Sequence, residues 1–255
     1  MAETEIFKLF LLVMARVGGL MATAPVLGSS NFPMMAKVGL TALTAILITP
    51  TLPALGWAIP EDPLSFSILA AGEAAVGMAM GFVMTMLFSA IQLGGQIVDM
   101  QSGFGMMNIF NPALETQFPI FGFFLFILAA LFLLITNGHH VMLRALAASY
   151  GHIPIGGFAP NPMLWREAAN WGATLFVDGL IISAPVAAAL MLAYVTMGLL
   201  GRLIPQIHLF AVGFPFTIGT AMFLIGMMLG AYIMVLDGML NQMYKDVATM
   251  MRGLG

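Results

Sequence analysis

Six long apolar segments dominate the chain and limit what it can fold into. Each is long enough to cross a hydrocarbon core of about 30 Å as an α-helix of about 20 residues. Of the 255 residues, 61% are hydrophobic and only 7% are charged, a composition far outside that of ordinary soluble domains. The sequence therefore predicts an all-α, membrane-associated helical bundle. The apolar segments comprise residues 6–27, 34–57, 66–93, 118–136, 174–200 and 209–236.

The charged and chemically reactive residues exclude several classes of function. The net charge is −3 and no basic run occurs, so neither nucleic acid nor an anionic lipid surface is indicated as a partner. Cysteine is absent, which excludes disulfides and thiolate metal sites. His139 and His140 are adjacent and have no third ligand at a suitable spacing, so no metal site is predicted. Nucleotide-binding and hydrolase motifs are absent from the sequence, and we expect a protein that is not an enzyme and uses no cofactor.

The N-terminal stretch does not have the pattern of a cleavable signal peptide. Glu3 and Glu5 stand where a basic region would be, and Arg16 interrupts the apolar core. We therefore expect the mature protein to keep this stretch.

Four charged residues lie within the apolar segments: Arg16, Lys37, Glu73 and Asp178. A charge at the centre of a membrane helix costs about 2.5–3.5 kcal/mol even on the lenient insertion scale, so each should be paired, solvated or buried against protein. Arg16 and Glu73 are a candidate ion pair. A proton relay is the competing interpretation, but no ladder of carboxylates follows along either helix, and we favour ion pairing. The positions assigned to buried charge and polar packing are Arg16, Glu73, Asp99, Gln101 and Asp178.

Prolines interrupt several of the apolar segments. Pro50 and Pro53 are predicted to end or kink the second segment, whereas Pro185 and Pro215 lie inside the fifth and sixth. Kinked helices are tolerated in membranes where neighbouring protein pairs the freed backbone carbonyls. We therefore expect kinked helices that pack mostly against protein.

Two pairs of glycines have the four-residue spacing that lets apolar helices approach closely. Gly77 and Gly81 lie in the third segment, and Gly226 and Gly230 lie in the sixth. Each pair is predicted to mark a close-packing face.

The loop after the third segment is too apolar for water and too irregular for lipid. The segment remains compatible with a helix for about eight turns and ends in the polar Gln96, Asp99 and Gln101, which we interpret as the approach to an aqueous lumen. Irregular backbone cannot face lipid, so the loop must sit against protein or line an internal space. Its glycines and large, pliable apolar side chains suit a deformable surface. The residues assigned to this candidate pore segment are Gly103, Phe104, Gly105, Met106, Met107, Ile109, Phe110 and Pro112.

The last third of the chain is predicted to form a helical hairpin. Arg202, Pro205 and Gln206 mark its tip, which we assign as a partner-facing surface. Beyond Asp237 the tail is amphipathic, and we expect such a tail to dock on a partner or a membrane surface. Its apolar face comprises Leu236, Leu240, Met243, Val247 and Met250.

Several short motifs occur in the order found in one protein family. They are RVGGLMATAPVLGSSNFP, GEAAVGMAMGF, IVDMQSGFGMMNIFNP, NGHH, HIPIG and RLIPQIHLFAVGFP. With these motifs in register over essentially its whole length, the chain resembles the FliR family of flagellar export-gate proteins, which has a counterpart in injectisomes. The PQIHLF sequence at the hairpin tip favours the flagellar branch over the injectisome branch.

The resemblance implies a role in a protein-export assembly. Family members join FliP and FliQ homologues in a closed helical assembly that stands largely above the plane of the bacterial inner membrane, within the flagellar basal body. This assembly forms the entrance channel for unfolded flagellar subunits, and FlhB and FlhA homologues adjoin it. For this chain the resemblance implies a single export-gate subunit, FliP-like over residues 1–170 with a plug loop at 101–117, and FliQ-like over 171–255.

The resemblance also implies that residues 103–112 plug the lumen, with Phe104 and Phe110 as the first candidates for the seal. A loop rich in Phe and Met suits a deformable hydrophobic seal. Two alternatives stay open. One is a conventional polytopic transporter or channel subunit for small solutes, which would rely on Glu73 and Asp178, and the other is a purely structural scaffold.

Overall fold

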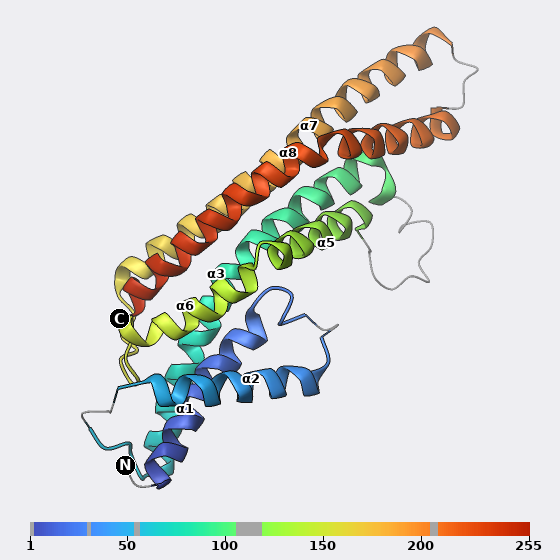
Figure 1. Cartoon of the computed structure of the whole chain (residues 1–255). Coiled ribbons are helices and arrows are strands. Elements are labelled where there is room, and N and C mark those ends of the chain that lie inside the picture. The colour runs from blue at the N-terminus through green and yellow to red at the C-terminus, as the bar shows by residue number, and fades with distance from the viewer. Residues whose placement is uncertain (1–2, 30–31, 54–56, 106–118, 205–208) are drawn as a thin grey trace. The chain divides into compact units, whose positions relative to one another are not determined.

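A computed structural model describes residues 3–29, 32–53, 57–105, 119–204 and 209–255 of the chain. These ranges are mainly α-helical and contain no strand, which confirms the predicted all-α class (Figure 1). The helices are α1 (Glu3–Thr23), α2 (Met34–Ile48), α3 (Pro63–Ser102), α5 (Ile120–Ile135), α6 (Gly138–His152), α7 (Pro162–Leu203) and α8 (Leu209–Leu254), and the 3₁₀ turn η1 (Thr49–Thr51) follows α2.

The lengths of the helices agree with five of the six predicted apolar segments. α1, α2 together with η1, α3, α7 and α8 are each long and apolar enough to cross a membrane. The fourth segment differs, because α5 has only 16 residues and is followed, after a bend of 68°, by α6, which is not among the predicted segments. Asn137 lies at the bend with a φ of 56°, a left-handed conformation that asparagine tolerates better than most residues. Only the bent pair as a whole counts as a sixth candidate span.

α3 begins at a well-formed cap. Asp62 precedes the helix, and its Oδ2 accepts hydrogen bonds from the backbone nitrogen and the hydroxyl of Ser65, both at 3.0 Å. Because these bonds favour the ionised carboxylate, the pKa of Asp62 lies below its ordinary value. Pro63 occupies the first helical position, where its missing N–H costs nothing. From there the helix runs for 40 residues, which confirms the long helix predicted for the third segment.

The prolines act as predicted in the second segment. α2 ends at Ile48, and Pro50 lies in η1. Pro185 lies inside α7 and Pro215 lies inside α8. Each of these internal prolines removes one intrahelical hydrogen bond from a long helix.

The chain divides into two compact units. Unit 1 contains Met1–Met86, Leu133–Trp171 and Asn241–Gly255, and unit 2 contains Leu87–Phe132 and Gly172–Leu240. Four helices, α3, α5, α7 and α8, contribute residues to both. This division follows spatial contacts within the chain, whereas the FliP-like and FliQ-like parts concern likeness to other chains and stay a prediction.

In unit 1, α1 and α3 cross where glycines bring the two backbones together. A Cβ added to Gly77 would overlap the carbonyl oxygen of Arg16, and one added to Gly81 would overlap Oγ1 of Thr23. A hydrogen bond also crosses this contact, since Oγ1 of Thr85 donates to the carbonyl oxygen of Thr23 at 2.6 Å. The Gly77–Gly81 pair therefore marks a close-packing face, as predicted.

The glycine pair in α8 does not behave in this way. Gly226 and Gly230 are exposed, and apart from the adjoining backbone of α8 no described atom lies within 4 Å of a Cβ added to either. Within the part of the chain that the structure describes, no helix lies against this face of α8, so its close packing stays a prediction.

Unit 2 encloses an apolar core between parts of α3, α5, α7 and α8. α3 and α5 meet at two glycines, and a Cβ added to Gly95 would overlap the Cα of Gly122. α3 also approaches α7 closely, since a Cβ on Gly94 would lie 2.9 Å from the carbonyl oxygen of Gly179. Small residues thus bring three helices together around large apolar side chains. The buried core residues are Val98, Phe121, Val186, Leu190, Ala221 and Ile225.

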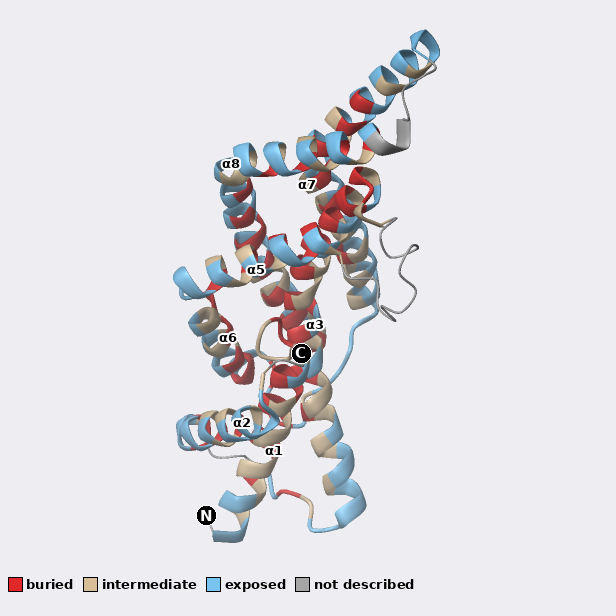
Figure 2. Ribbon diagram, turned by 90° about the vertical axis from the view of Figure 1, so that its right-hand side faces the viewer, coloured by how far each residue is buried: buried red, intermediate tan, exposed pale blue. Residues whose placement is uncertain are grey.

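Burial differs strongly between helices (Figure 2). In the most apolar stretch of α3, 56% of the residues are buried, compared with 17% for α2 with η1, 22% for α7 and 11% for α8. The apolar side chains of α2, α7 and α8 are therefore largely presented outward, where lipid or another protein can cover them.

The end of α8 corrects one expectation. The predicted apolar face of the tail is present, but it is buried within the chain and is not left free for a partner or a membrane surface. Backbone hydrogen bonds also hold the tail, since the carbonyl oxygens of Leu254 and Gly253 accept from the amides of Ala159 and Asn161, each at 3.0 Å. The five buried residues of the face are Leu236, Leu240, Met243, Val247 and Met250.

Replacing Gly77 by alanine should destabilise unit 1, because the new methyl group would overlap the backbone of α1. Overpacking of a tight contact costs about 1–3 kcal/mol. We expect the Gly77→Ala protein to unfold at a lower temperature than the parent in detergent. The matched Gly226→Ala variant adds a methyl group at an exposed helical position with no neighbouring helix in the described ranges, and it should unfold at or slightly above the parental temperature, because alanine favours a helix over glycine by up to about 1 kcal/mol. Equal midpoints for the two variants would contradict the close packing of α1 on α3.

Candidate functional site

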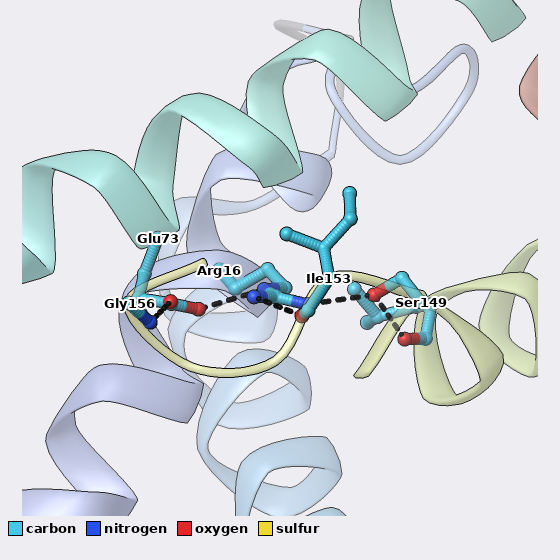
Figure 3. A network of polar contacts seen from close by, with 6 residues as sticks. Arg16, Glu73, Ser149, Ile153 and Gly156 are labelled. Atoms are coloured by element: carbon cyan, nitrogen blue, oxygen red, sulfur yellow. Dashed lines mark hydrogen bonds and ion pairs between the residues drawn. The ribbon is translucent and has the colours of Figure 1, made fainter. Parts of the chain in front are cut away.

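Arg16 is completely buried in unit 1, and its guanidinium is bonded on several sides (Figure 3). Its Nε donates to Oε2 of Glu73 at 2.7 Å. Its Nη1 donates to Oγ of Ser149 and its Nη2 to the carbonyl oxygen of Ile153, both at 3.0 Å. The guanidinium carbon also lies 4.1 Å from the centre of the Tyr150 ring, a cation–π contact. The structure therefore contains the ion pair that the sequence predicts, with additional partners that the sequence analysis did not identify.

Two of the partners that the sequence analysis did not identify are backbone groups of the HIPIG motif. The second oxygen of Glu73, Oε1, accepts the amide hydrogen of Gly156 at 3.0 Å. Gly156 has a φ of 79°, a left-handed conformation that favours glycine, and this bends the turn so that the carbonyl of Ile153 and the amide of Gly156 both face the ion pair (Figure 3). Both carboxylate oxygens of Glu73 are thus bonded within unit 1. This arrangement favours a structural ion pair over a proton relay.

Lys37 and Asp178 are the other two charged residues of the predicted apolar segments. Nζ of Lys37 donates to the carbonyl oxygen of Gly28 at 2.9 Å, which ties α2 to the turn that follows α1. Asp178 lies half-buried in the part of α7 that belongs to unit 2.

The structure describes the candidate pore segment as far as Gly105. Gly103 has a φ of 96°, and a Cβ there would press on the ring of Phe214 in α8. The ring of Phe104 packs edge-on against that of Phe121 in α5, with 5.4 Å between the ring centres. The first residues of the segment are therefore held against α5 and α8. The assigned residues outside the described ranges are Met106, Met107, Ile109, Phe110 and Pro112.

Hydrogen bonds fix the end of α3 where this segment begins. The carbonyl oxygen of the buried Ser102 accepts a hydrogen bond from Oγ1 of Thr217 in α8 at 2.7 Å. The hydroxyl of Tyr194 in α7 donates to the carbonyl oxygen of Gln101. The Gln101 side chain is half-buried, and its Oε1 has no hydrogen-bond partner among the described residues. The last turn of α3 is thus attached to both helices of the hairpin.

Asp99 is buried one turn before the end of α3, with only 4% of its surface exposed. Its Oδ1 accepts the amide hydrogen of Phe121 and its Oδ2 accepts that of Gly122, both at 3.0 Å. Asp99 therefore occupies a buried packing position, as assigned. The interpretation of this carboxylate as part of an aqueous approach is not supported, because both of its oxygens face the backbone of α5.

The remaining assigned positions lie at the hairpin tip. Arg202 is exposed in the last turn of α7, whereas Pro205 and Gln206 lie outside the described residues. Within the described ranges, no group of three or more His, Asp or Glu side chains could hold a metal ion. His139 and His140 in α6 contact each other, with their ring centres 4.2 Å apart.

Unit 2 also contains an apolar cavity of about 230 Å³ between its helices. Pro185 of α7, Leu125 of α5 and Tyr232 of α8 contribute to its lining. The Tyr232 hydroxyl donates to the carbonyl oxygen of Leu125 at 2.9 Å. No charged side chain occurs among the described residues that line the cavity. Binding sites for polar solutes need a few well-placed polar groups, so this cavity does not have the chemistry of such a site.

Removal of Arg16 should be far more damaging than removal of an exposed arginine. In Arg16→Met, Glu73 would stay buried without its cation, which costs about 3–5 kcal/mol. The double variant Arg16→Met/Glu73→Leu should lose less than the sum of the two single changes, because no unpaired charge remains. Thermal unfolding in detergent tests both expectations. The control Arg144→Met, at an exposed position in α6, should stay within about 0.5 kcal/mol of the parent. Additive losses would contradict the coupling.

The chain is similar to known export proteins over most of its length. A family model described as "Bacterial export proteins, family 1" matches residues 7–243. The flagellar biosynthetic protein FliR of Bacillus subtilis (strain 168) is 31% identical over 224 residues, which cover 85% of this chain and 84% of that protein. The FliR protein of Escherichia coli (strain K12) is 30% identical, with 83% and 80% covered, and that of Caulobacter vibrioides is 25% identical, with 88% and 89% covered. The chain therefore belongs to the FliR family of bacterial export proteins.

Proposed function

We propose that this chain is a core subunit of the flagellar type III protein export gate. The observation that carries the proposal is its match to the FliR family over more than four fifths of its length. In this role it joins FliP and FliQ homologues to form the entrance channel through which unfolded flagellar subunits are secreted. FlhB and FlhA homologues adjoin the assembly, which lies in the bacterial inner membrane within the flagellar basal body.

The outward apolar surface of the helices supports a role in a hetero-oligomer. In the most apolar stretch of α8 only 11% of the residues are buried, and Gly226 and Gly230 are exposed on the same helix. Exposed small residues allow a further helix to approach closely, as in membrane-helix packing. Under the proposal, partner helices cover these faces, with residues 1–170 in a FliP-like place and 171–255 in a FliQ-like place.

We further propose that residues 103–112 plug the lumen of the gate. Gly103 and Phe104 lie at the junction of α3, α5 and α8, where a segment can be attached firmly at its base. The remaining residues of the segment are apolar enough to exclude water and ions from a narrow passage. Phe104 and Phe110 are the first candidates for the seal.

The alternative of a conventional solute transporter has little to support it. Such a protein needs polar groups that are free to bind substrate near the middle of the membrane. Both oxygens of Glu73 are bonded to Arg16 and Gly156, and the described cavity of unit 2 has an apolar lining. These observations favour a gate subunit over a carrier for small solutes.

Copurification tests the assembly. Coexpressed with its FliP and FliQ homologues, the chain should elute as one large complex that survives detergent, and expressed alone it should be unstable because its outward apolar faces are uncovered. A stable, transport-competent monomer would refute the gate proposal.

Deletion of residues 103–105 tests the plug. In cells that carry the assembled gate, the deletion should increase the permeability of the membrane to small ions, because the seal loses its attachment. A milder change, Phe104→Ala, should leak less than the deletion, and Phe176→Ala, at an exposed site in α7, should not leak. Normal permeability together with normal export in the deletion strain would refute the plug.

A further inference from the structure

α5 begins without a capping side chain of its own. Its first helical residue is Ile120, preceded by Pro119, and no Ser, Thr, Asp or Asn stands at this point of the sequence. In an isolated helix the first amides have no backbone acceptor and need a side chain, water or ligand to bond them. For the amides of Phe121 and Gly122, burial near the core of unit 2 makes such an acceptor necessary.

Asp99 of α3 supplies the missing cap from a different helix. Each of its two oxygens accepts one of the two amides at 3.0 Å, across separations of 22 and 23 residues in sequence. A negative charge at a helix N-terminus is also favoured by the helix dipole. The close approach of Gly95 to Gly122, one turn earlier on α3, brings the carboxylate within reach of α5.

The last turn of α3 is also bonded to α8. Oγ of Ser102, three residues after Asp99, donates to the carbonyl oxygen of Asp99 at 3.2 Å. The carbonyl oxygen of Ser102 accepts from Oγ1 of Thr217 in α8. Phe104 then packs on Phe121, the residue whose amide Asp99 holds. The end of α3 and the beginning of α5 are therefore joined through one carboxylate and one aromatic contact.

We propose that Asp99 is a positioning residue that clamps the first turn of α5 to the last turn of α3 and so fixes the base of the segment between these helices. Its consequence for sealing rests on the plug function proposed above. The role needs a carboxylate, because two neighbouring amides each require an acceptor. Asparagine offers one acceptor and would turn its NH₂ group toward the other N–H.

Hydrogen exchange on the purified complex of this chain with its FliP and FliQ homologues measures the clamp directly. The first-turn amides of α5 have no intrahelical acceptor, so their protection depends on Asp99. In Asp99→Asn, we expect the amides of Phe121 and Gly122 to exchange about tenfold faster, since a charge-assisted bond is lost, and in Asp99→Ala faster still. Amides in the middle of α5 should keep their parental rates.

The control is the same substitution at another helix start. Asp62→Asn replaces the exposed cap of α3, where asparagine caps about as well as aspartate, and it should leave exchange at both helices unchanged. Parental protection of Phe121 and Gly122 in both Asp99 variants would overturn the proposal.

Ion permeability separates the clamp from the plug. If the proposal is right, Asp99→Asn leaks ions and loses protection at α5 together, as the deletion of residues 103–105 leaks. If the deletion leaks but Asp99→Asn does not, despite faster exchange, Asp99 does not position the segment and the proposal fails. If exchange becomes faster and neither strain leaks, the clamp stands and the plug function fails.

Discussion

The burial of the Arg16 guanidinium is the constraint on which the packing of unit 1 depends. A guanidinium without solvent needs an anion and several acceptors, and two separate stretches of chain provide them: Glu73 in α3, and the end of α6, where Ser149 and the carbonyl of Ile153 accept. An uncompensated buried charge costs several kcal/mol, so these stretches are stable only when they are in place together. One residue in α1 thereby fixes a turn 137 residues away in the sequence.

Close backbone contact makes this pairing possible in so apolar a chain. Gly77 lies one turn after Glu73 on α3, and its hydrogen stands against the carbonyl oxygen of Arg16. A larger residue at Gly77 would separate the helices and lengthen the 2.7 Å ion pair. The ion pair therefore depends on the glycine, because the small residue sets the distance between the two helices that carry the charges.

The sequence predicts features that depend on residue type and spacing, and it fails where a backbone group or a distant neighbour decides. The apolar segments, the Arg16–Glu73 pair and the Gly77–Gly81 face follow from hydropathy, charge and spacing. The carbonyl of Ile153 could not be predicted as a partner, because every residue carries one. α6 was missed since it is less apolar and is defined by the bend at Asn137. The periodicity of the tail showed which residues face an apolar neighbour, but it carries no information on whether that neighbour is the same chain.

In the candidate site, Asp99 shows both what the sequence predicts and what it does not. The sequence marks Asp99 as a polar residue in apolar surroundings, and two interpretations follow, a group facing water or a buried group with partners. The deciding signal was the start of α5, where Pro119 leaves the helix without a cap. Glu73 and Asp99 then differ in what their loss would leave behind. Without Glu73 a buried cation is uncompensated, which threatens the whole of unit 1, whereas without Asp99 two buried amides lose their acceptor, which affects the first turn of α5. The second effect is local, and a local effect suits the positioning role proposed for Asp99, because one helix turn can be released while the surrounding bundle stays folded.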